Sequence, residues 1–309
     1  MKKSETTATW PDMSQNGLTD RDNVPPLPPS SRIHFHPFRR GLKPSPPQHR
    51  SSSSNPSSAP DYSWEITQNL LKAESSCQLP AHYLSTQSDI NPLTRAVLVD
   101  FLIDLHRKLN LTPETLYLAI GLFDRVLAVE KVGRAKVQLL GVSALMVASK
   151  YEEVTIPQVS QYLEAMDGAY GKEDILGMER SILKAVGFGV SVPTAFTFYS
   201  RVESLVVEDQ VTMALGMYIM ELSLMEYPAL DYRASLLTSS AYYLAKRLRS
   251  RPSPWPPVLQ RQFGYSETDL KPCLRLLYPV YISAEKSVLQ AARKKYASAA
   301  FFEVSKLRL

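Results

Sequence analysis

The chain has 309 residues, is 44% hydrophobic and carries a formal net charge of +5, so it can bury one or two sizeable cores and shows no charge excess that by itself indicates nucleic-acid binding. Its two cysteines, Cys77 and Cys273, are far apart in the sequence, which argues against a disulfide framework or a thiolate zinc site and fits a reducing, intracellular setting. We expect no secretory signal, because residues 1–5 lead into no apolar run, and no membrane span, because no run of about 18 apolar residues occurs.

Residues 1–60 differ in composition from the rest of the chain. They hold eleven of the 23 prolines and include a serine run at 51–54. Such a segment buries too little apolar surface to offset its ordering entropy, so we predict a disordered regulatory tail. A solvated linker is the favoured interpretation, and docking of its proline-rich part into an aromatic-lined groove is the alternative.

Helical patterns dominate from residue 61 onward. One helix begins at Asn91-Pro92 and continues with leucines at helical spacing, namely Leu98, Leu102, Leu105 and Leu109. Thr112-Pro113-Glu114 is a second start signal, with a threonine cap, a proline in the first turn and an acid near the positive end of the helix dipole. Further helices are expected at 134–150, after Ile156-Pro157, and at 172–186.

A second helical region opens at Pro193-Thr194, with helical periodicity over residues 205–224 and 233–248. The helices at 134–150 and 233–248 are both rich in small residues, which is typical of central helices, and their spacing suggests an internal duplication. A loop is expected at 252–257 and a helix at 266–296, interrupted at Pro272 and Pro279. Strand signals are scarce, so we predict an all-α fold of two bundles in series, with domains at 61–190 and 191–309 after the tail at 1–60.

The sequence contains no recognisable catalytic motif. It lacks the phosphate-binding loop of nucleotide hydrolases, the glycine-rich loop and H-R-D motif of kinases, and the H-E-x-x-H metal motif. The adjacent acids Glu152 and Glu153 would point about 100° apart on a helix and so cannot share a site. We predict no catalytic residues, no metal site and no cofactor.

Several motifs occur in order and at spacings that resemble the cyclin box, and mitotic B-type cyclins in particular. They are Gln87-Ser88-Asp89-Ile90, the run at 134–139, Lys150-Tyr151-Glu152-Glu153, and the runs at 295–298 and 301–306. The resemblance covers residues 61–309. It implies two consecutive five-helix cyclin-box bundles in a subunit that binds and allosterically activates a cyclin-dependent Ser/Thr protein kinase in G2/M, mitotic or meiotic control.

The resemblance also assigns roles to particular residues. Five anchors of the box match Arg95, Asp124, Leu139, Lys150 and Glu179. It implies that Arg95 and Asp124 form an internal ion pair, and that Lys150 and Glu179 lie on the face that grips the kinase. The apolar partners on that face match Ile66, Tyr151, Leu183 and Phe188. Taken alone, a lysine and a glutamate such as Lys150 and Glu179 are most often solvated surface charges. For Leu183 and Phe188, ordinary core residues remain the alternative.

A second implied site is the docking groove for Arg-x-Leu peptides of substrates and inhibitors. Its positions match Thr94, Val97, Leu98, Phe101, Asp104, Arg134 and Gln138. Thr94 and Phe101 stand where family members commonly carry methionine and tryptophan, which shrinks the apolar floor. Lys108 stands where an acid is often found and would repel a docking arginine. We therefore expect weakened or altered docking.

The tail carries two short candidate signals. Arg39-Arg40-Gly41-Leu42 has the Arg-x-x-Leu form of a destruction signal read by the ubiquitin-ligase machinery, and Ser45, before Pro46, is a candidate phosphosite. Both patterns also arise by chance. We expect the protein in the nucleus and cytoplasm, with a kinase as its heterodimer partner and with neither nucleic acid nor membrane as a partner.

Two other functions remain open. The departures at Thr94, Phe101 and Lys108 allow a divergent cyclin that acts as a kinase-binding scaffold without full activation. A cyclin-fold nucleic-acid factor would need a basic stripe, and the run Arg293-Lys294-Lys295 is too short to provide one.

Overall fold

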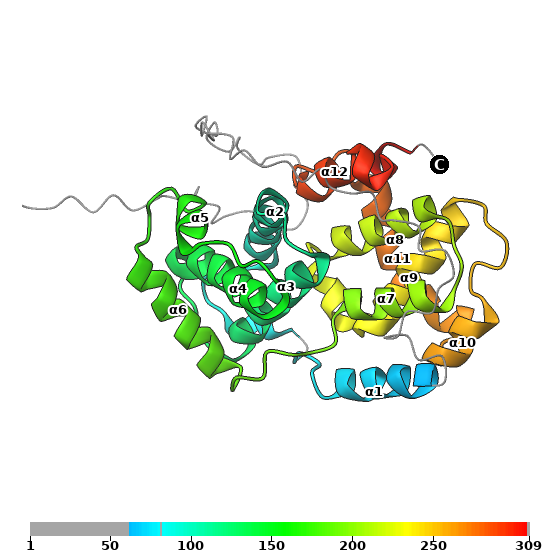
Figure 1. Ribbon diagram of the computed structural model, residues 1–309, viewed down its shortest axis with the longest axis horizontal. Coiled ribbons are helices and arrows are strands. Elements are labelled where there is room, and N and C mark those ends of the chain that lie inside the picture. The colour runs from blue at the N-terminus through cyan, green and yellow to red at the C-terminus, as the bar shows by residue number, and fades with distance from the viewer. Residues whose placement is uncertain (1–61, 81, 308–309) are drawn as a thin grey trace, which may run out of the picture. The chain divides into compact units, whose positions relative to one another are not determined.

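Two helical bundles follow each other in the computed structural model, which describes residues 62–80 and 82–307 (Figure 1). The first bundle contains α2 (Pro92–Lys108), α3 (Pro113–Val129), α4 (Val137–Glu152), α5 (Val159–Glu164) and α6 (Lys172–Ala185). The second contains α7 (Ala195–Leu205), α8 (Gln210–Ser223), α9 (Ala234–Leu248), α10 (Pro257–Phe263) and α11 (Glu267–Ser283). The predicted all-α architecture of two five-helix bundles is confirmed.

Shorter elements connect and flank these bundles. A leading helix, α1 (Ser63–Ser75), is followed by η2 (Tyr83–Thr86), and η3 (Arg134–Lys136) precedes α4. In the second bundle η4 (Tyr227–Asp231) joins α8 to α9. The C-terminal segment contains α12 (Ala291–Tyr296), η5 (Ala299–Phe301) and η6 (Val304–Lys306). Within the described ranges, no helix combines the length and apolarity needed to cross a bilayer.

The two small-residue helices are central, as predicted. In α4 every residue from Leu139 to Ser149 is buried, and the helix packs against both α3 and α6. A Cβ added at Gly141 would lie 2.8 Å from Leu98 Cδ2, so the missing side chain is what lets α2 approach α4. In the second bundle α9 packs against α7, α8 and α11.

Two helix boundaries differ from the prediction. The helix expected at 205–224 is interrupted, because α7 ends at Leu205 and α8 begins at Gln210. Asp209 caps α8, since its side chain accepts a hydrogen bond from Thr212 N at 3.1 Å. The apolar residues Val206 and Val207 continue the hydrophobic pattern across this break, so the pattern did not indicate it. The expected interruptions at Pro272 and Pro279 are wrong, because α11 runs through both, and the helix expected over 266–296 is broken instead between Ser283 and Ala291. Both prolines are exposed on α11, so water can reach the carbonyl groups that they leave unbonded.

The leading helix α1 packs against the second bundle, although we expected it to belong with the first. It contacts α10, and Gln68 Nε2 donates to Gln262 O at 3.1 Å (Figure 1). Arg201 of α7 donates to Ser63 O at 3.0 Å. At the other end of α1, Glu74 accepts hydrogen bonds from the backbone N and the Oγ of Ser235, both at 2.7 Å. The leading helix is therefore held by contacts with the second bundle.

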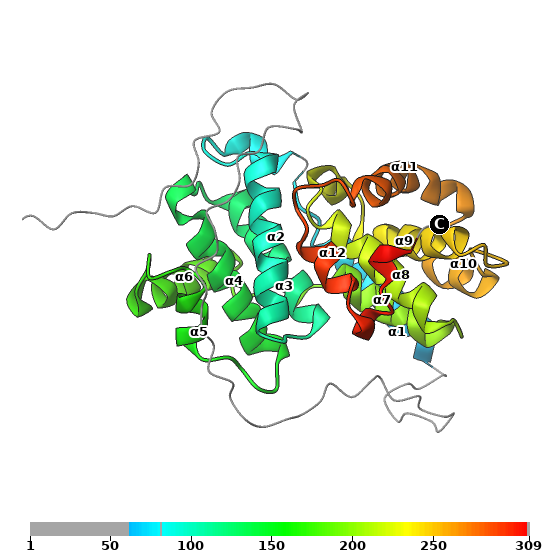
Figure 2. The ribbon, with the colours of Figure 1, turned by 90° about the horizontal axis from the view of Figure 1, so that it is seen from above.

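The C-terminal helix α12 links the two bundles from the opposite end of the chain. It lies beside α2 and α8 (Figure 2). Asp100 of α2 accepts a hydrogen bond from Ala291 N at 2.8 Å. Lys295 forms a buried ion pair with Glu221 of α8 at 2.6 Å, and the Tyr296 hydroxyl donates to the same carboxylate at 3.1 Å. These contacts place charged groups inside the junction.

His106 of α2 makes this junction sensitive to pH. Burial, together with Lys295, lowers the pKa of His106 to about 3, although the hydrogen bond from its Nε2–H to Thr112 O opposes the shift. Below about pH 6.5 His106 is protonated in the unfolded chain but stays neutral in the folded chain. The free energy of unfolding therefore decreases as the pH is lowered, by about 2 kcal/mol at about pH 5. We expect urea unfolding of His106→Gln to show a pH dependence smaller by that amount. Identical pH dependence in the wild type and the variant would contradict this.

Candidate functional site

Lys150 and Glu179 meet on the surface of the first bundle. Lys150 lies in the last turn of α4 and Glu179 in the middle of α6, and these two helices pack together. Lys150 Nζ lies 2.7 Å from Glu179 Oε1 and 2.9 Å from Oε2. The lysine side chain remains 38% exposed and the glutamate side chain 16% exposed. The pair is therefore formed in the chain itself and still open to a partner.

Exposed apolar side chains occur close to this pair in the sequence. Tyr151 follows Lys150 and is 54% exposed, and Phe188 is 74% exposed beyond the end of α6. Phe188 has φ +60°, which costs a non-glycine residue about 1–3 kcal/mol, and its N–H donates to Leu183 O at 2.8 Å. Leu183 is half-buried against the core, so it supports this surface more than it forms it. Large exposed apolar groups of this kind often mark protein interfaces.

The loop between α4 and α5 adds two apolar residues that the sequence did not single out. Val154 is fully exposed and Ile156 is 46% exposed. Both follow directly after the Lys-Tyr-Glu-Glu motif, so their position beside it was the available signal. Ile66, the remaining predicted member of the face, is half-buried on α1. The helix that carries it, α1, packs against α10 of the second bundle.

Glu153, the last acid of the motif, has a structural role. Its Oε1 accepts hydrogen bonds from Thr112 N at 2.6 Å and from Thr115 Oγ1 at 2.6 Å. It thereby caps the N-terminus of α3, where a negative charge is favourable. The expected cap by Thr112 is wrong, because the Thr112 hydroxyl makes no capping bond and donates to Glu153 instead.

Arg95 and Asp124 form the predicted ion pair inside the first bundle. Arg95 Nε lies 2.7 Å from Asp124 Oδ1, and Nη2 lies 2.7 Å from Oδ2, with both side chains almost fully buried. Burial alone would lower the pKa of Arg95, but Asp124 outweighs it and raises that pKa above its ordinary value. The contact is bidentate, so both the charges and the N–H groups facing Asp124 are satisfied.

Two further groups complete this network, and the sequence analysis missed both. The Tyr83 hydroxyl donates to Asp124 Oδ1 at 2.6 Å, and Arg95 Nη1 donates to Leu224 O at 2.7 Å. Leu224 belongs to the second bundle, directly after α8. The network around this ion pair therefore makes three connections. It links α2 to α3, η2 to α3, and the first bundle to the second.

The predicted docking surface on α2 differs from the expectation in one residue. Leu98 is only 1% exposed and packs on Gly141, so it belongs to the core and cannot contact a peptide. The remaining positions are half-buried, namely Thr94, Val97, Phe101, Asp104, Arg134 and Gln138. The Thr94 hydroxyl is used locally, since it donates to Asn91 Oδ1 at 3.0 Å.

Asp104 on this surface is already paired. Its carboxylate lies 2.8 Å from Arg107 Nη2 and 2.9 Å from Lys108 Nζ. Burial raises the pKa of Asp104, but hydrogen bonds from Lys108 and Arg107 outweigh it and the net effect is a lowered pKa. Two exposed cations thus surround one acid, which disfavours an incoming arginine more than Lys108 alone would.

Gln87, the first residue of the Gln-Ser-Asp-Ile motif, has a structural role in this fold. Its Nε2 donates to Leu127 O at 2.6 Å and to Glu130 O at 2.7 Å, and its Oε1 accepts from Val132 N at 3.1 Å. These bonds hold the end of α3 and the loop after it. The candidate tail residues Arg39, Leu42 and Ser45 lie outside the described residues.

Comparison with known families agrees with this geometry. The model of the cyclin N-terminal domain matches residues 65–191, and that of the cyclin C-terminal domain matches residues 193–308. The chain belongs to the cyclin family. The matched ranges meet at the connection between α6 and α7, where the first bundle ends.

Relatives of this cyclin include B-type and G2/mitotic-specific cyclins. It is 39% identical to Cyclin-B1-4 of Arabidopsis thaliana over 227 residues, which are 73% of this chain and 59% of the relative. It is 38% identical to the G2/mitotic-specific cyclin S13-7 of Glycine max over 218 residues, covering 71% of this chain and 85% of the relative. Cyclin-B2-1 of Oryza sativa subsp. japonica is 36% identical over 249 residues, 81% of this chain and 59% of the relative. The cyclin thus spans about three fifths of two of these relatives.

Solved structures support the fold. A viral cyclin from herpesvirus saimiri superposes with a TM-score of 0.64 at 15% identity, over 70% of this chain and 96% of that chain. A chain of the yeast RNA Pol II CTD kinase CTDK-1 complex superposes with a TM-score of 0.54 at 13% identity, over 75% and 81% of the two chains. At these identities the likeness concerns the cyclin fold alone.

Proposed function

We propose that this cyclin binds a cyclin-dependent Ser/Thr protein kinase and activates it allosterically in G2/M, mitotic or meiotic control. The observation that carries the proposal is the Lys150–Glu179 pair, which stays accessible beside the exposed side chains of Tyr151 and Phe188. A few placed charges within exposed apolar surface suit a stable protein interface. The mitotic names of the relatives support the cell-cycle assignment.

The proposed mechanism is a shift of the kinase population. A kinase alone mostly occupies an inactive arrangement, and a partner that binds only the active arrangement moves the equilibrium by its differential affinity. The rigid first bundle, with α4 buried throughout residues 139–149, can act as a fixed template. The phosphoryl transfer is then carried out by the kinase, and this chain supplies the binding energy.

A scaffold that binds a kinase without fully activating it is the second candidate. The paired Asp104, together with Thr94 and Phe101 on α2, favours it, because these changes concern substrate docking rather than the kinase face. Co-purification of the full chain with a panel of cyclin-dependent kinases tests both candidates. Capture of one kinase with gain of histone-kinase activity supports activation, and capture without activity supports the scaffold. Capture of no kinase would contradict both.

Peptide docking on α2 gives a separate prediction. We expect the wild type to bind an Arg-x-Leu peptide weakly, and the double variant Phe101→Trp with Lys108→Glu to bind it about tenfold or more tightly. The larger indole restores apolar floor, and the new acid removes one of the two cations that surround Asp104. Fluorescence polarisation with a labelled peptide measures both affinities.

A matched control separates docking from general charge effects. Lys72→Glu makes the same charge change at an exposed position on α1, outside α2. It should leave peptide affinity unchanged. Equal, tight binding by the wild type and the double variant would show that docking is not weakened. Degradation through Arg39 and Leu42, phosphorylation of Ser45, and location in nucleus and cytoplasm remain predictions.

A further inference from the structure

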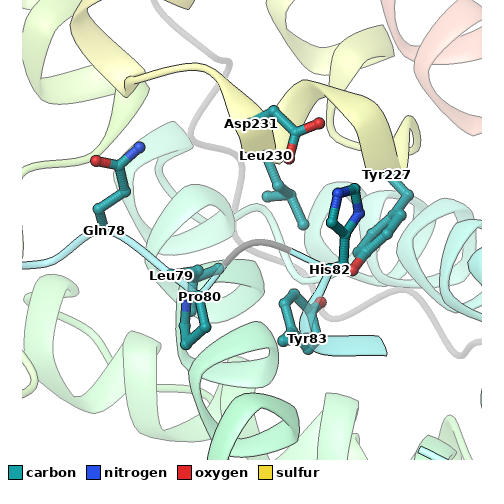
Figure 3. A pocket seen from close by; sticks show the side chains of 8 residues that line it. All are labelled: Gln78, Leu79, Pro80, His82, Tyr83, Tyr227, Leu230 and Asp231. Atoms are coloured by element: carbon teal, nitrogen blue, oxygen red, sulfur yellow. The ribbon is translucent and has the colours of Figure 1, made fainter. Parts of the chain in front are cut away.

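A cleft between the two bundles has no role in the kinase-binding proposal. Its volume is about 190 Å³, and its walls come from α3, from the segment after α1, from η4 and from the start of α9. A pocket of about 310 Å³ adjoins it and shares Gln78, Leu79 and Leu230 (Figure 3). In Figure 3 the segment with Gln78, Leu79 and Pro80 faces η4, which carries Tyr227, Leu230 and Asp231.

Most polar groups of the cleft are satisfied within the chain. Arg95 and Asp124 neutralise each other. Glu74 accepts two hydrogen bonds from Ser235, and the Thr194 hydroxyl donates to Glu114. These groups therefore hold the bundles together and offer little to a ligand.

Two groups are exceptions: the Tyr117 hydroxyl, which is buried without a partner, and Arg125 of α3. Its Nη2 donates to Gly189 O at 2.7 Å, while its Nη1 is shielded from water and has no acceptor. Burial lowers the pKa of Arg125, and no carboxylate among residues 62–80 and 82–307 forms an ion pair with it. A cation held in this way has unmet capacity for an anion, because a guanidinium binds carboxylates through several N–H groups at once.

The rest of the lining is mixed. Its polar members include a second cation, Arg233, which interacts with the carboxylate of Glu74, and the others are Gln78, Ser223 and Tyr232. Ile120 of α3, Leu237 of α9 and Val192, before α7, lie around the same cleft as Arg125. About 190 Å³ is less than the roughly 300–1,000 Å³ of sites that enclose a whole small molecule. The space suits one large side chain of a peptide better than a cofactor.

We propose that this inter-bundle cleft docks a peptide segment of a partner protein in which a large apolar residue stands next to an acidic one. The apolar side chain enters between α3 and α9, and the carboxylate meets Arg125. The adjoining pocket would disfavour the acid, because the exposed Asp231 lines it (Figure 3). The docking site meets the kinase face only through Arg125, whose Nη2 donates to Gly189 O beside Phe188, and it does not depend on activation of a kinase.

The thiol of Cys77 allows the proposal to be tested by disulfide labelling. It is exposed and lines the cleft near Arg125, whereas the other cysteine, Cys273, is buried. Three probes with the same activated-disulfide linker would be offered to the full chain, carrying acetyl-Phe-Asp, acetyl-Phe-Asn or acetyl-Phe-Lys. Intact-mass measurement under a competing thiol gives the fraction of Cys77 labelled at equilibrium. Cys77→Ser is the control for labelling elsewhere.

Two variants probe the two halves of the site. Arg125→Gln removes the cation. Gly121→Leu fills the cleft, and a Cβ at that position on α3 would meet no atom within 4 Å, so the variant should fold. Arg261→Gln and Ser200→Leu are the matched controls, since both positions are exposed and neither residue lines the cleft.

The expected result is a preference of about tenfold for the Phe-Asp probe over the Phe-Asn and Phe-Lys probes in the wild type. Arg125→Gln should abolish that preference, Gly121→Leu should reduce labelling by the Phe-Asp probe to the level of the other two, and the two controls should change neither. Equal labelling by all three probes, or a preference that survives Arg125→Gln or Gly121→Leu, would overturn the proposal. Kinase capture by Gly121→Leu should match the wild type, which keeps this test independent of the proposed function.

Discussion

Replacing Asp124 with alanine is expected to lower the free energy of unfolding by about 3–5 kcal/mol, the largest effect of any single substitution considered. The change strands the Arg95 guanidinium in a site where its side chain is 1% exposed. It also removes the acceptor of the Tyr83 hydroxyl, a buried donor that would be left unpaired. Urea unfolding followed by circular dichroism measures the loss.

A double variant shows whether the stranded charge is the cause. Arg95→Met with Asp124→Leu removes both charges and keeps apolar volume, so it should recover part of the stability lost in Asp124→Ala. Recovery should be incomplete, because Leu224 O and the Tyr83 hydroxyl then lack partners. The exposed pair of Lys306 and Glu303 is the control, and Lys306→Ala should cost less than about 1 kcal/mol. A double variant no more stable than Asp124→Ala would contradict the charge argument.

The second large effect concerns kinase binding. We expect Lys150→Ala and Glu179→Ala each to weaken kinase affinity by at least roughly 30-fold, equivalent to about 2 kcal/mol, because each would remove a polar anchor within the exposed face. Folding should hardly change, since a partly exposed ion pair contributes about 0–1 kcal/mol. Surface plasmon resonance with the captured kinase, alongside thermal unfolding, separates the two effects.

Exchanging the two charges distinguishes a binding role from an internal one. Lys150→Glu combined with Glu179→Lys can rebuild the ion pair between α4 and α6 with its polarity reversed. If the residues hold kinase groups directly, the exchanged variant should bind as poorly as the single variants. Restoration of wild-type affinity by the exchange would show that the pair only stabilises the surface.

Local signals in the sequence predicted much of the fold because they act over a few residues. Asn91-Pro92 and Pro193-Thr194 start helices α2 and α7 as expected, with Asn91 and Thr194 accepting the capping bonds. The errors occurred where tertiary contacts decide. Glu153 caps α3 from 41 residues away in place of Thr112. Likewise α1 packs against α10 rather than against its neighbours in the sequence.

The candidate site shows the same division. The resemblance placed Lys150 and Glu179 on one face, and the structure brings them within 2.7 Å. The sequence analysis did not predict that Asp104 pairs with Arg107 and Lys108, although their positions three and four residues later on the same helix were the available signal. Leu98 was assigned to the docking surface although it packs on Gly141, since periodicity alone does not show how closely α4 approaches.

The most direct test of the central proposal is a titration of the purified partner kinase with the full chain, read out as histone phosphorylation. We expect saturable activation by the wild type at equimolar cyclin. The midpoint concentration should rise by at least roughly 30-fold for Lys150→Ala and Glu179→Ala and stay unchanged for Lys306→Ala. Binding without any rise in activity, or full activation by both face variants, would contradict it.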